Sequence, residues 1–326
     1  MKKIITILMV SVMILTLFAF TGCKTEEPTL KLGLGLDISA SATDATEDKA
    51  GQGQATVTAA AVLVDADGKI VKAFIDCADN KVGYTADGKA VANDSFKTKY
   101  ELGKDYNMVA YGGAVKEWFE QADAFCALIV GKTATEVKAL VAEGNKGTDE
   151  VINAGCTIDI AEFASAIDNA ISNATASDAT KNDTLKLGIV TSQTVTDATE
   201  DKAGSNKVEI NLFAAAANAE GKVVAASSDC VEVSFGFDTA GKSTFDATKE
   251  VLSKKAQGDN YGMKAYGGSA KEWYEQAAAF DAACIGKTAN EIGGLMAEDH
   301  KGTADLQAAG CTITINGFVK AASKIG

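Results

Sequence analysis

The chain has 326 residues, of which 47% are hydrophobic and 23% are charged, and its formal net charge is -13 at pH 7. This composition is that of a globular protein and excludes a disordered chain, while the length suits two domains of about 150 residues. The acidic balance, without a cluster of Lys and Arg, argues against a nucleic-acid partner.

The first 23 residues predict export and a lipid anchor. Lys2 and Lys3 precede an apolar run from Ile4 to Phe20, and small residues then lead to Cys23. The pattern resembles a bacterial lipoprotein signal, whose cysteine is lipidated and becomes the mature N-terminus, although Phe20 replaces the usual Leu. A plain signal peptide and a membrane helix are the alternatives, but the run is short for a span. We expect lipidation at Cys23, a tether over residues 24–30, and a place on the extracytoplasmic face of the cell membrane.

The rest of the chain contains a long internal repeat. Thr43 to Gly51 recurs unchanged at Thr196 to Gly204, and Ala110 to Phe125 matches Ala265 to Phe280 at twelve of sixteen positions. A repeat of this length is a whole domain rather than a solenoid unit. We therefore predict one domain at residues 31–171, a linker at 172–183 and a second domain at 184–326.

The first half of each copy is expected to form an antiparallel sheet. Apolar and polar residues alternate from Lys207 to Leu212, which is typical of a strand with one buried face. A Gly-Lys turn leads to the next strand of each copy, Ile70 to Asp76 and Val223 to Asp229. A third extended stretch is expected near Tyr84 and near Phe237.

The second half of each copy is expected to be helical. Apolar side chains from Val115 to Ile129 fall on one helical face, and Trp273 to Phe280 repeat the pattern. Thr133 with Glu136, and Thr288 with Glu291, are predicted capping boxes of the next helical segments. Each copy is thus an α+β domain, with helices packed on a hairpin-rich antiparallel sheet.

One tetrapeptide stands before the last helix of both copies, as Ala154-Gly155-Cys156-Thr157 and Ala309-Gly310-Cys311-Thr312. Asp159 is the expected N-cap of the helix that follows in the first copy. The threonines are therefore predicted to lie on Gly-containing turns just ahead of a helix N-terminus, where free N–H groups and the helix dipole favour a phosphate.

Other motifs have weaker functional interpretations. Gly131-Lys132-Thr133 resembles the end of a P-loop but lacks the required earlier glycine, so helix capping is favoured. The acidic loop with Asp44, Glu47 and Asp48 lacks the ligand pattern of an EF-hand, so a solvated loop is favoured over calcium. His300 is expected on the surface, and one histidine in a duplicated chain argues against hydrolase triads and structural zinc.

Six cysteines follow Cys23, and the sequence does not determine whether they pair. Their positions argue against a disulfide framework, and small buried thiols are the favoured interpretation. The set is Cys77, Cys126, Cys156, Cys230, Cys284 and Cys311.

The two tetrapeptide turns, each preceded by an acid and followed by an amphipathic helix, resemble the FMN-binding domain. That family carries FMN as a phosphoester on the last residue of a D-x-x-[Ser/Thr]-G-A-[Thr/Ser] motif. The chain departs from it where Ala154 and Ala309 replace Ser or Thr, and where Cys156 and Cys311 replace Ala. The nearest acids, Asp149 and Asp305, lie slightly farther upstream. The whole chain looks most like tandem flavinylated lipoproteins of extracellular electron transfer.

The resemblance implies covalent FMN on Thr157 and Thr312, two cofactors in all. It implies a flavin transferase that attaches FMN, a membrane quinone oxidase as electron donor, and extracellular electron acceptors. A redox carrier is expected rather than a substrate-specific enzyme, with no metal. Besides the turns Gly155-Cys156 and Gly310-Cys311, the candidate flavin-ring contacts are Met108, Tyr111 and Gly112, with Met263, Tyr266 and Gly267.

Three alternatives remain open at this stage. The turn could serve only as a helix cap without a ligand. The protein could be a surface lipoprotein that binds a ligand or a partner and has no redox cofactor, or it could be a structural surface module. Flavin that survives denaturation distinguishes the carrier from all three.

Overall fold

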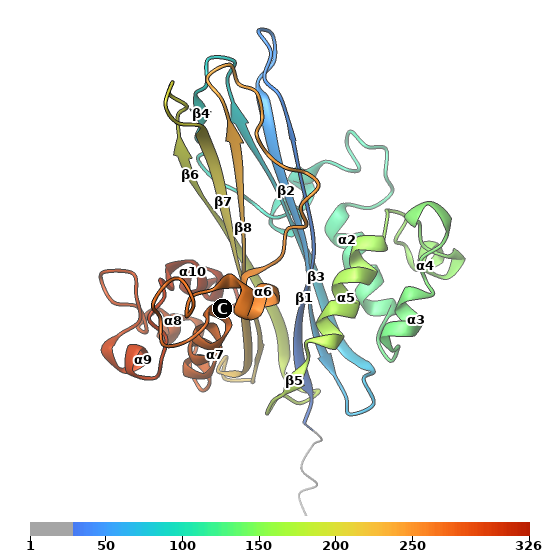
Figure 1. The fold of residues 1–326 in the computed structure, drawn as a ribbon. Helices are drawn as coiled ribbons and strands as arrows, with labels where there is room; N and C mark the ends of the chain where they lie inside the picture. The colour runs from blue at the N-terminus through green and yellow to red at the C-terminus, as the bar shows by residue number, and fades with distance from the viewer. Residues whose placement is uncertain (1–28) are drawn as a thin grey trace, which may run out of the picture.

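The computed structural model describes residues 29–326, in which two antiparallel sheets stand face to face and helices cover their outer sides (Figure 1). Antiparallel sheets packed by helices confirm the predicted α+β class. The predicted signal, Cys23 and most of the tether lie outside the described residues.

Each sheet is built around three long strands. The first has the order β4-β3-β2-β1-β5, and the second has the order β6-β7-β8. The strands are β1 Lys31–Thr43, β2 Gly51–Val64, β3 Ile70–Tyr84, β4 Ala90–Val91, β5 Thr175–Ala176, β6 Thr184–Thr196, β7 Gly204–Ala217 and β8 Val223–Phe237.

The predicted hairpins are confirmed, but one detail of the strand prediction is wrong. Tyr84 and Phe237 do not lie on a third extended stretch; they end β3 and β8, which continue unbroken for 15 residues each. The segment 172–183, expected to be a linker, contains β5, which pairs with the start of β1. The end of a strand depends on how far its pairing partner extends, which a local sequence pattern does not show. Here β2 and β7 pair with β3 and β8 along almost their whole length.

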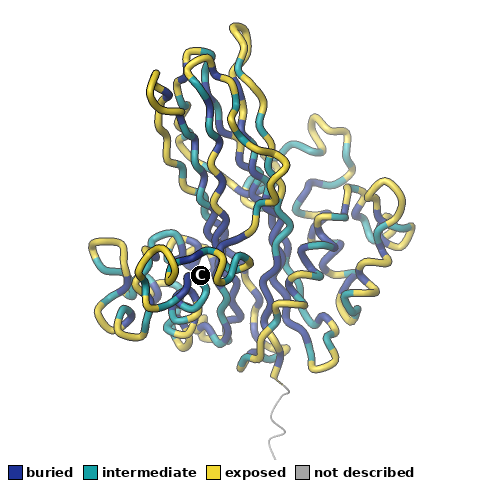
Figure 2. The backbone as a smooth tube through the Cα atoms, in the orientation of Figure 1, coloured by how far each residue is buried: buried dark blue, intermediate teal, exposed yellow. Residues whose placement is uncertain are grey.

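The central strands are buried on both faces because each sheet lies between the other sheet and a layer of helices. Along β2, Val57, Ala59 and Leu63 contact the opposite sheet, whereas Ala60 and Val62 contact the helices. The same alternation along β7 sends its side chains into two different cores. The apolar cluster between the sheets draws residues from both halves of the chain, so the halves share one core. Buried backbone accordingly follows the strands where the two sheets lie together (Figure 2).

Helices cover the outer face of each sheet. Those of the first half are α1 Lys99–Leu102, α2 Trp118–Leu128, α3 Ala134–Lys138, α4 Asp149–Ala154 and α5 Ala161–Ser172. Those of the second are α6 Lys254–Gln257, α7 Trp273–Cys284, α8 Ala289–Gly293, α9 Ala304–Ala308 and α10 Asn316–Ser323. Short 3-10 turns occur at Gly103–Tyr106, Glu143–Asn145 and Gly258–Tyr261. In residues 29–326 no helix has the length and apolar character needed to cross a membrane.

Helix starts follow the capping rules at most of the predicted places. Thr133 with Glu136 and Thr288 with Glu291 form complete capping boxes, as predicted. Val115 does not belong to the predicted long helix: it is 94% exposed, because Glu117 forms a capping box with Glu120 and starts α2 at Trp118.

The acidic loops join β1 to β2 and β6 to β7, and at this end of the sheets they connect the two halves. Ala45 N–H donates to Gly241 O, and Ala198 N–H donates to Gly88 O, both at 2.8 Å. Between these loops the ring of Tyr84 stacks on that of Phe237, with centroids 4.6 Å apart. The acidic segments thus act as hairpin loops that join the halves through their backbones.

Glycines in β1 and β6 let the last helix of each half lie directly on the sheet. A Cβ added at Gly33 or Gly35 would collide with the backbone of Ala170 in α5, and one at Gly188 would collide with Ala321 O in α10. This close approach fixes α5 and α10 against the sheets.

We predict that Gly35→Ala destabilises the protein by about 1–3 kcal/mol or more, because the methyl group overlaps helix backbone that cannot move without disturbing the core. Denaturant unfolding measures the effect. Gly83→Ala is the matched control, since its Cβ would meet nothing closer than 3.6 Å, and its cost should stay within about 0.5 kcal/mol. Equal costs for both substitutions would contradict this packing.

Candidate functional site

Each tetrapeptide turn begins where a short helix ends. Gly155 caps α4 in the left-handed conformation with φ 101°, and Gly310 follows α9 with φ 102°. The next residues, Cys156 and Cys311, are fully buried, whereas Thr157 and Thr312 return to the surface. The turn therefore presents one threonine hydroxyl on each half of the molecule.

The threonine lies ahead of the next helix, as predicted, but the predicted cap of that helix is wrong. Helix α5 begins at Ala161 with Ile160 as its N-cap, and no side chain caps it. Asp159, the predicted cap, instead pairs with Lys146 at 2.6 Å, while Ile160 N–H donates to Asn145 O. The threonine is thus four residues before α5, and the helix starts one residue later than the predicted cap at Asp159 implies, because the intervening residues pair with the loop around Asn145.

A buried glutamine holds each threonine. Thr157 donates its N–H and its hydroxyl to Oε1 of Gln121, at 2.8 and 3.1 Å. Thr312 makes the same two bonds to Gln276, at 2.8 and 2.9 Å. In both halves the glutamine Nε2 donates to a backbone carbonyl, that of Lys116 or Lys271, which orients the amide so that Oε1 faces the threonine.

A lysine ammonium lies against each glycine of the turn. Nζ of Lys271 donates to Ala309 O at 3.1 Å, and a Cβ on Gly310 would collide with it. Nζ of Lys116 occupies the equivalent place against Gly155. A positive charge is therefore beside the threonine turn in both halves, which favours an anionic ligand group there.

In the second half the threonine opens into a cavity of about 340 Å³, within the range of small-molecule sites. Thr312 lines it together with Met263, Tyr261, Trp273 and Phe318. Lys254 adds a charge: its Nζ lies 5.6 Å from the centroid of Tyr261 and 3.3 Å from a carboxylate oxygen of Glu232. Aromatic walls, one ammonium and an accessible hydroxyl therefore meet in one place.

The first half repeats the lysine and aromatic residues of this site. Lys99 Nζ lies 5.6 Å from the ring centroid of Tyr106 and 5.7 Å from that of Trp118. Met108 packs against the core beneath them. A buried glutamate, Glu117, fixes this loop by accepting Met108 N–H at 2.9 Å.

The structure brings only part of the predicted ring-contact set to the cavity. Met263 and Thr312 line it, but the side chains of Tyr111 and Tyr266 are 88% and 92% exposed. Gly112 and Gly267 make close turns against the carbonyls of Met108 and Met263, so their lack of a side chain serves the loop itself. Tyr261 and Trp273 provide the aromatic walls that Tyr266 was expected to provide.

The glutamine, the lysine and the anchoring glutamate were missed as site residues. A signal for them was present, because the sequence from Lys116 to Gln121 recurs as Lys271 to Gln276 with one change. Helical periodicity assigned this segment to the core, and its polar residues were left without a role.

Of the described cysteines, Cys230 lines the cavity of the second half, and Cys156 and Cys311 lie next to the threonines in the chain. Desolvation raises the pKa of Cys156 and of Cys311 to about 11, so both thiols stay protonated at neutral pH. The six described cysteines are all unpaired and buried. Residues 29–326 contain no group of three or more His, Cys, Asp or Glu placed to hold a metal ion.

Comparison with known proteins found no match: neither a family model, nor a curated protein, nor a solved structure matches this chain. The site is therefore interpreted from its own geometry.

One buried carboxylate supports the helix that carries Lys99, and it should make stability depend on pH. Asp76 accepts N–H bonds from Cys77 and Tyr100, and burial raises its pKa from 3.8 to about 6 against these bonds. The folded state therefore binds this proton more tightly than the unfolded chain does. The contribution of the protonated Asp76 carboxyl to the free energy of unfolding is fully present below about pH 4 and is lost as the pH rises through 6.

We predict that the free energy of unfolding of Asp76→Asn, which keeps the acceptor oxygen, rises by about 3 kcal/mol relative to that of the wild type as the pH increases from 4 to 7. The pKa difference of about two, at roughly 1.4 kcal/mol per pH unit, gives this figure. Urea unfolding at several pH values measures it. Parallel stability curves for the two proteins would refute the role given to Asp76.

Proposed function

We propose that the protein is a lipid-anchored electron carrier at the cell surface, with one FMN esterified to Thr157 and one to Thr312. The observation that carries the proposal is the accessible hydroxyl of Thr312 on the wall of an aromatic cavity, held by Gln276 and beside the ammonium of Lys271. The repeated sequence motif and its resemblance to the FMN-binding domain give the cofactor its identity.

The residues present fit a phosphoester at this position. Esterification removes the hydroxyl proton that Thr312 donates, but Gln276 Oε1 still accepts the backbone N–H of Thr312. The turn therefore keeps its anchor in both states. Lys271 is close enough to the turn to neutralise part of a phosphate charge, and Gly310 leaves room for its ammonium.

The protein would supply position, charge and exclusion of water, whereas bound FMN supplies the redox chemistry. Tyr261, Trp273 and Met263 provide apolar contacts for a planar ring, and Lys254 places a positive charge against it. In the first half, Tyr106, Trp118 and Lys99 occupy the equivalent positions.

Attachment needs a donor of FMN, for which the resemblance implies FAD and a flavin transferase. The threonine oxygen forms the new bond to the FMN phosphorus, the bond between the two phosphoryl groups of FAD breaks, and AMP and the hydroxyl proton leave. A membrane quinone oxidase would then deliver electrons, and extracellular acceptors would take them. The carrier itself needs no substrate pocket beyond the flavin sites.

We predict that intact-mass analysis of the protein from its native host shows two FMN additions, and that Thr157→Val or Thr312→Val each removes one. Valine keeps the shape and lacks the hydroxyl, so the melting temperature should change little, with a cost of about 1 kcal/mol for the lost hydrogen bond. Thr→Ser at the same positions is the control and should retain attachment. Two flavins on the valine variants, in folded protein, would refute the assignment, and a flavin-free wild type would favour a ligand-binding lipoprotein.

We also predict that Lys271→Met lowers the occupancy of flavin on Thr312 and leaves that on Thr157 unchanged, because the substitution removes the charge and keeps an unbranched chain against Gly310. Lys264→Met is the matched control, since Lys264 pairs with Glu275 at 2.8 Å on the surface. Site-resolved occupancy from peptide mass spectrometry compares them. Equal occupancies in the two variants would show that Lys271 does not act on the phosphate.

A further inference from the structure

A buried asparagine forms part of the wall of the Thr312 cavity. Asn211 lies on β7, is 5% exposed and lines the cavity together with Glu209 of the same strand. Its Nδ2 donates to Oε1 of Glu209 at 3.2 Å. Because only the NH2 group of an amide can donate to a carboxylate, this bond fixes the orientation of the amide.

The carbonyl oxygen of this amide is left without a partner. Within residues 29–326, Oδ1 of Asn211 accepts no hydrogen bond, and it is not one of the unpaired atoms that the protein seals from its surroundings. The oxygen therefore opens onto the cavity that Asn211 lines. Buried polar groups are nearly always paired, so this acceptor indicates a hydrogen-bond donor that belongs to a ligand.

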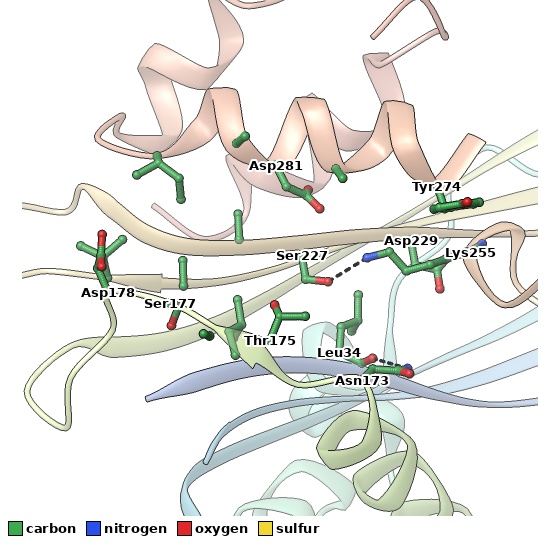
Figure 3. A pocket seen from close by; sticks show the side chains of 18 residues that line it. Leu34, Asn173, Thr175, Ser177, Asp178, Ser227, Asp229, Lys255, Tyr274 and Asp281 are labelled. Carbon is green, nitrogen blue, oxygen red and sulfur yellow. Dashed lines mark hydrogen bonds between the residues drawn. The ribbon is translucent and has the colours of Figure 1, made fainter. Parts of the chain in front are cut away.

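A larger cavity between the two halves offers no such acceptor. Its volume is about 650 Å³, and it lies between β1 and β5 of the first half and β8, α6 and α7 of the second (Figure 3). There Lys255 Nζ donates to Ser227 Oγ at 3.0 Å, and Asn173 Nδ2 donates to Leu34 O at 3.1 Å (Figure 3). Oδ1 of Asp281 is unpaired but fully buried, so it does not open onto this cavity.

A glycine makes room for the side chain of Asn211. Gly317, the second residue of α10, faces the amide, and a Cβ there would lie 2.3 Å from Nδ2 and 2.6 Å from Oδ1. Any larger residue at position 317 would therefore push the amide out of its place in the cavity wall. Strand β7 and helix α10 thus position the asparagine together.

The first half has a different pair at the two equivalent positions. Thr58 and Glu162 stand in place of Asn211 and Gly317, and Thr58 Oγ1 donates to Oε2 of Glu162 at 3.1 Å. In the first half the polar group of the strand is therefore paired with the helix of the same half. In the second half the strand presents an acceptor to the cavity instead.

We infer that Asn211 binds the ring of the flavin at Thr312, an inference that rests on the function proposed above. The attached end of the ligand is at Thr312, which is exposed, so the far end reaches the deeply buried residues of the cavity, among them Asn211. An oxidised flavin ring carries one N–H group, at N3. This N–H donates to Oδ1 of Asn211 and makes the second site selective for flavins with an unsubstituted N3.

Isothermal titration calorimetry of the full mature chain, produced without a flavin transferase, tests the inference with riboflavin and 3-methylriboflavin. Riboflavin has no phosphate, so its affinity reports on the ring contacts rather than on Lys271. The methyl group of the second probe removes the N–H donor. We expect riboflavin to bind about tenfold more tightly than the methylated probe, because the acceptor is left unpaired with the latter.

The variant Asn211→Ala removes the other end of the same hydrogen bond. It should weaken riboflavin binding by about tenfold and leave the affinity for 3-methylriboflavin unchanged, since the two changes are not additive. The matched control is Asn80→Ala, which alters a buried asparagine of β3 that does not line this cavity and should change neither affinity. Melting temperatures confirm that both variants fold.

Four results would each overturn the role of Asn211. These are equal affinities of the wild type for the two probes, equal losses for both probes in Asn211→Ala, the same loss in Asn80→Ala, and no riboflavin binding at millimolar concentration. Peptide masses of the native protein separate this failure from that of the proposed function. Flavin on Thr312 with one of these results refutes only the role of Asn211, whereas an unmodified Thr312 refutes the attachment.

Discussion

The face-to-face contact between the two sheets is the constraint on which the rest of the structure depends. Alternate residues of β2 and β7 enter this contact, which leaves the other set of side chains to be covered from outside by helices. The helices therefore occupy the two outer layers, where α2 and α7 carry the glutamines of the threonine turns and the lysines lie just before these helices. Because the halves share the central core, neither sheet can separate without exposing apolar strands, and a cavity of about 650 Å³ is lined by residues of both halves.

The two halves show how one scaffold supports two kinds of feature. Around the threonine turn they keep the same contacts, a glutamine to the threonine and an ammonium against the glycine. At the edge of the sheets they differ, with an aromatic cluster around Tyr100 and an open cavity around Lys255. Contacts that are retained support a shared role, whereas at the edge the cavity of the second half, about 650 Å³, is larger than the equivalent hollow of the first half, about 360 Å³.

Much of the fold could be predicted from the sequence, because its determinants are local. Alternation in β7, the Gly-Lys turns and the Thr-Glu capping boxes all act within a few residues, and the strand, the turns and the capping boxes are confirmed, although β7 is buried on both faces rather than on one. The features that were missed depend on partners elsewhere in the chain. Strand β5 pairs with β1, and Asp159 forms an ion pair with Lys146. Gln276 accepts a hydrogen bond from Thr312, which is 36 residues away in the sequence. The threonines were identified from the motif, but the lysine beside them and the aromatic cavity required the packing of α7 against β8.

The central claim is that the threonine hydroxyls are the points of flavin attachment. Proteolysis of denatured protein from the native host, followed by tandem mass spectrometry of the yellow peptides, tests it most directly. The account predicts two flavin-bearing peptides, one with the added mass on Thr157 and the other with it on Thr312. Unmodified threonines in both peptides, or flavin on any other residue, would contradict it.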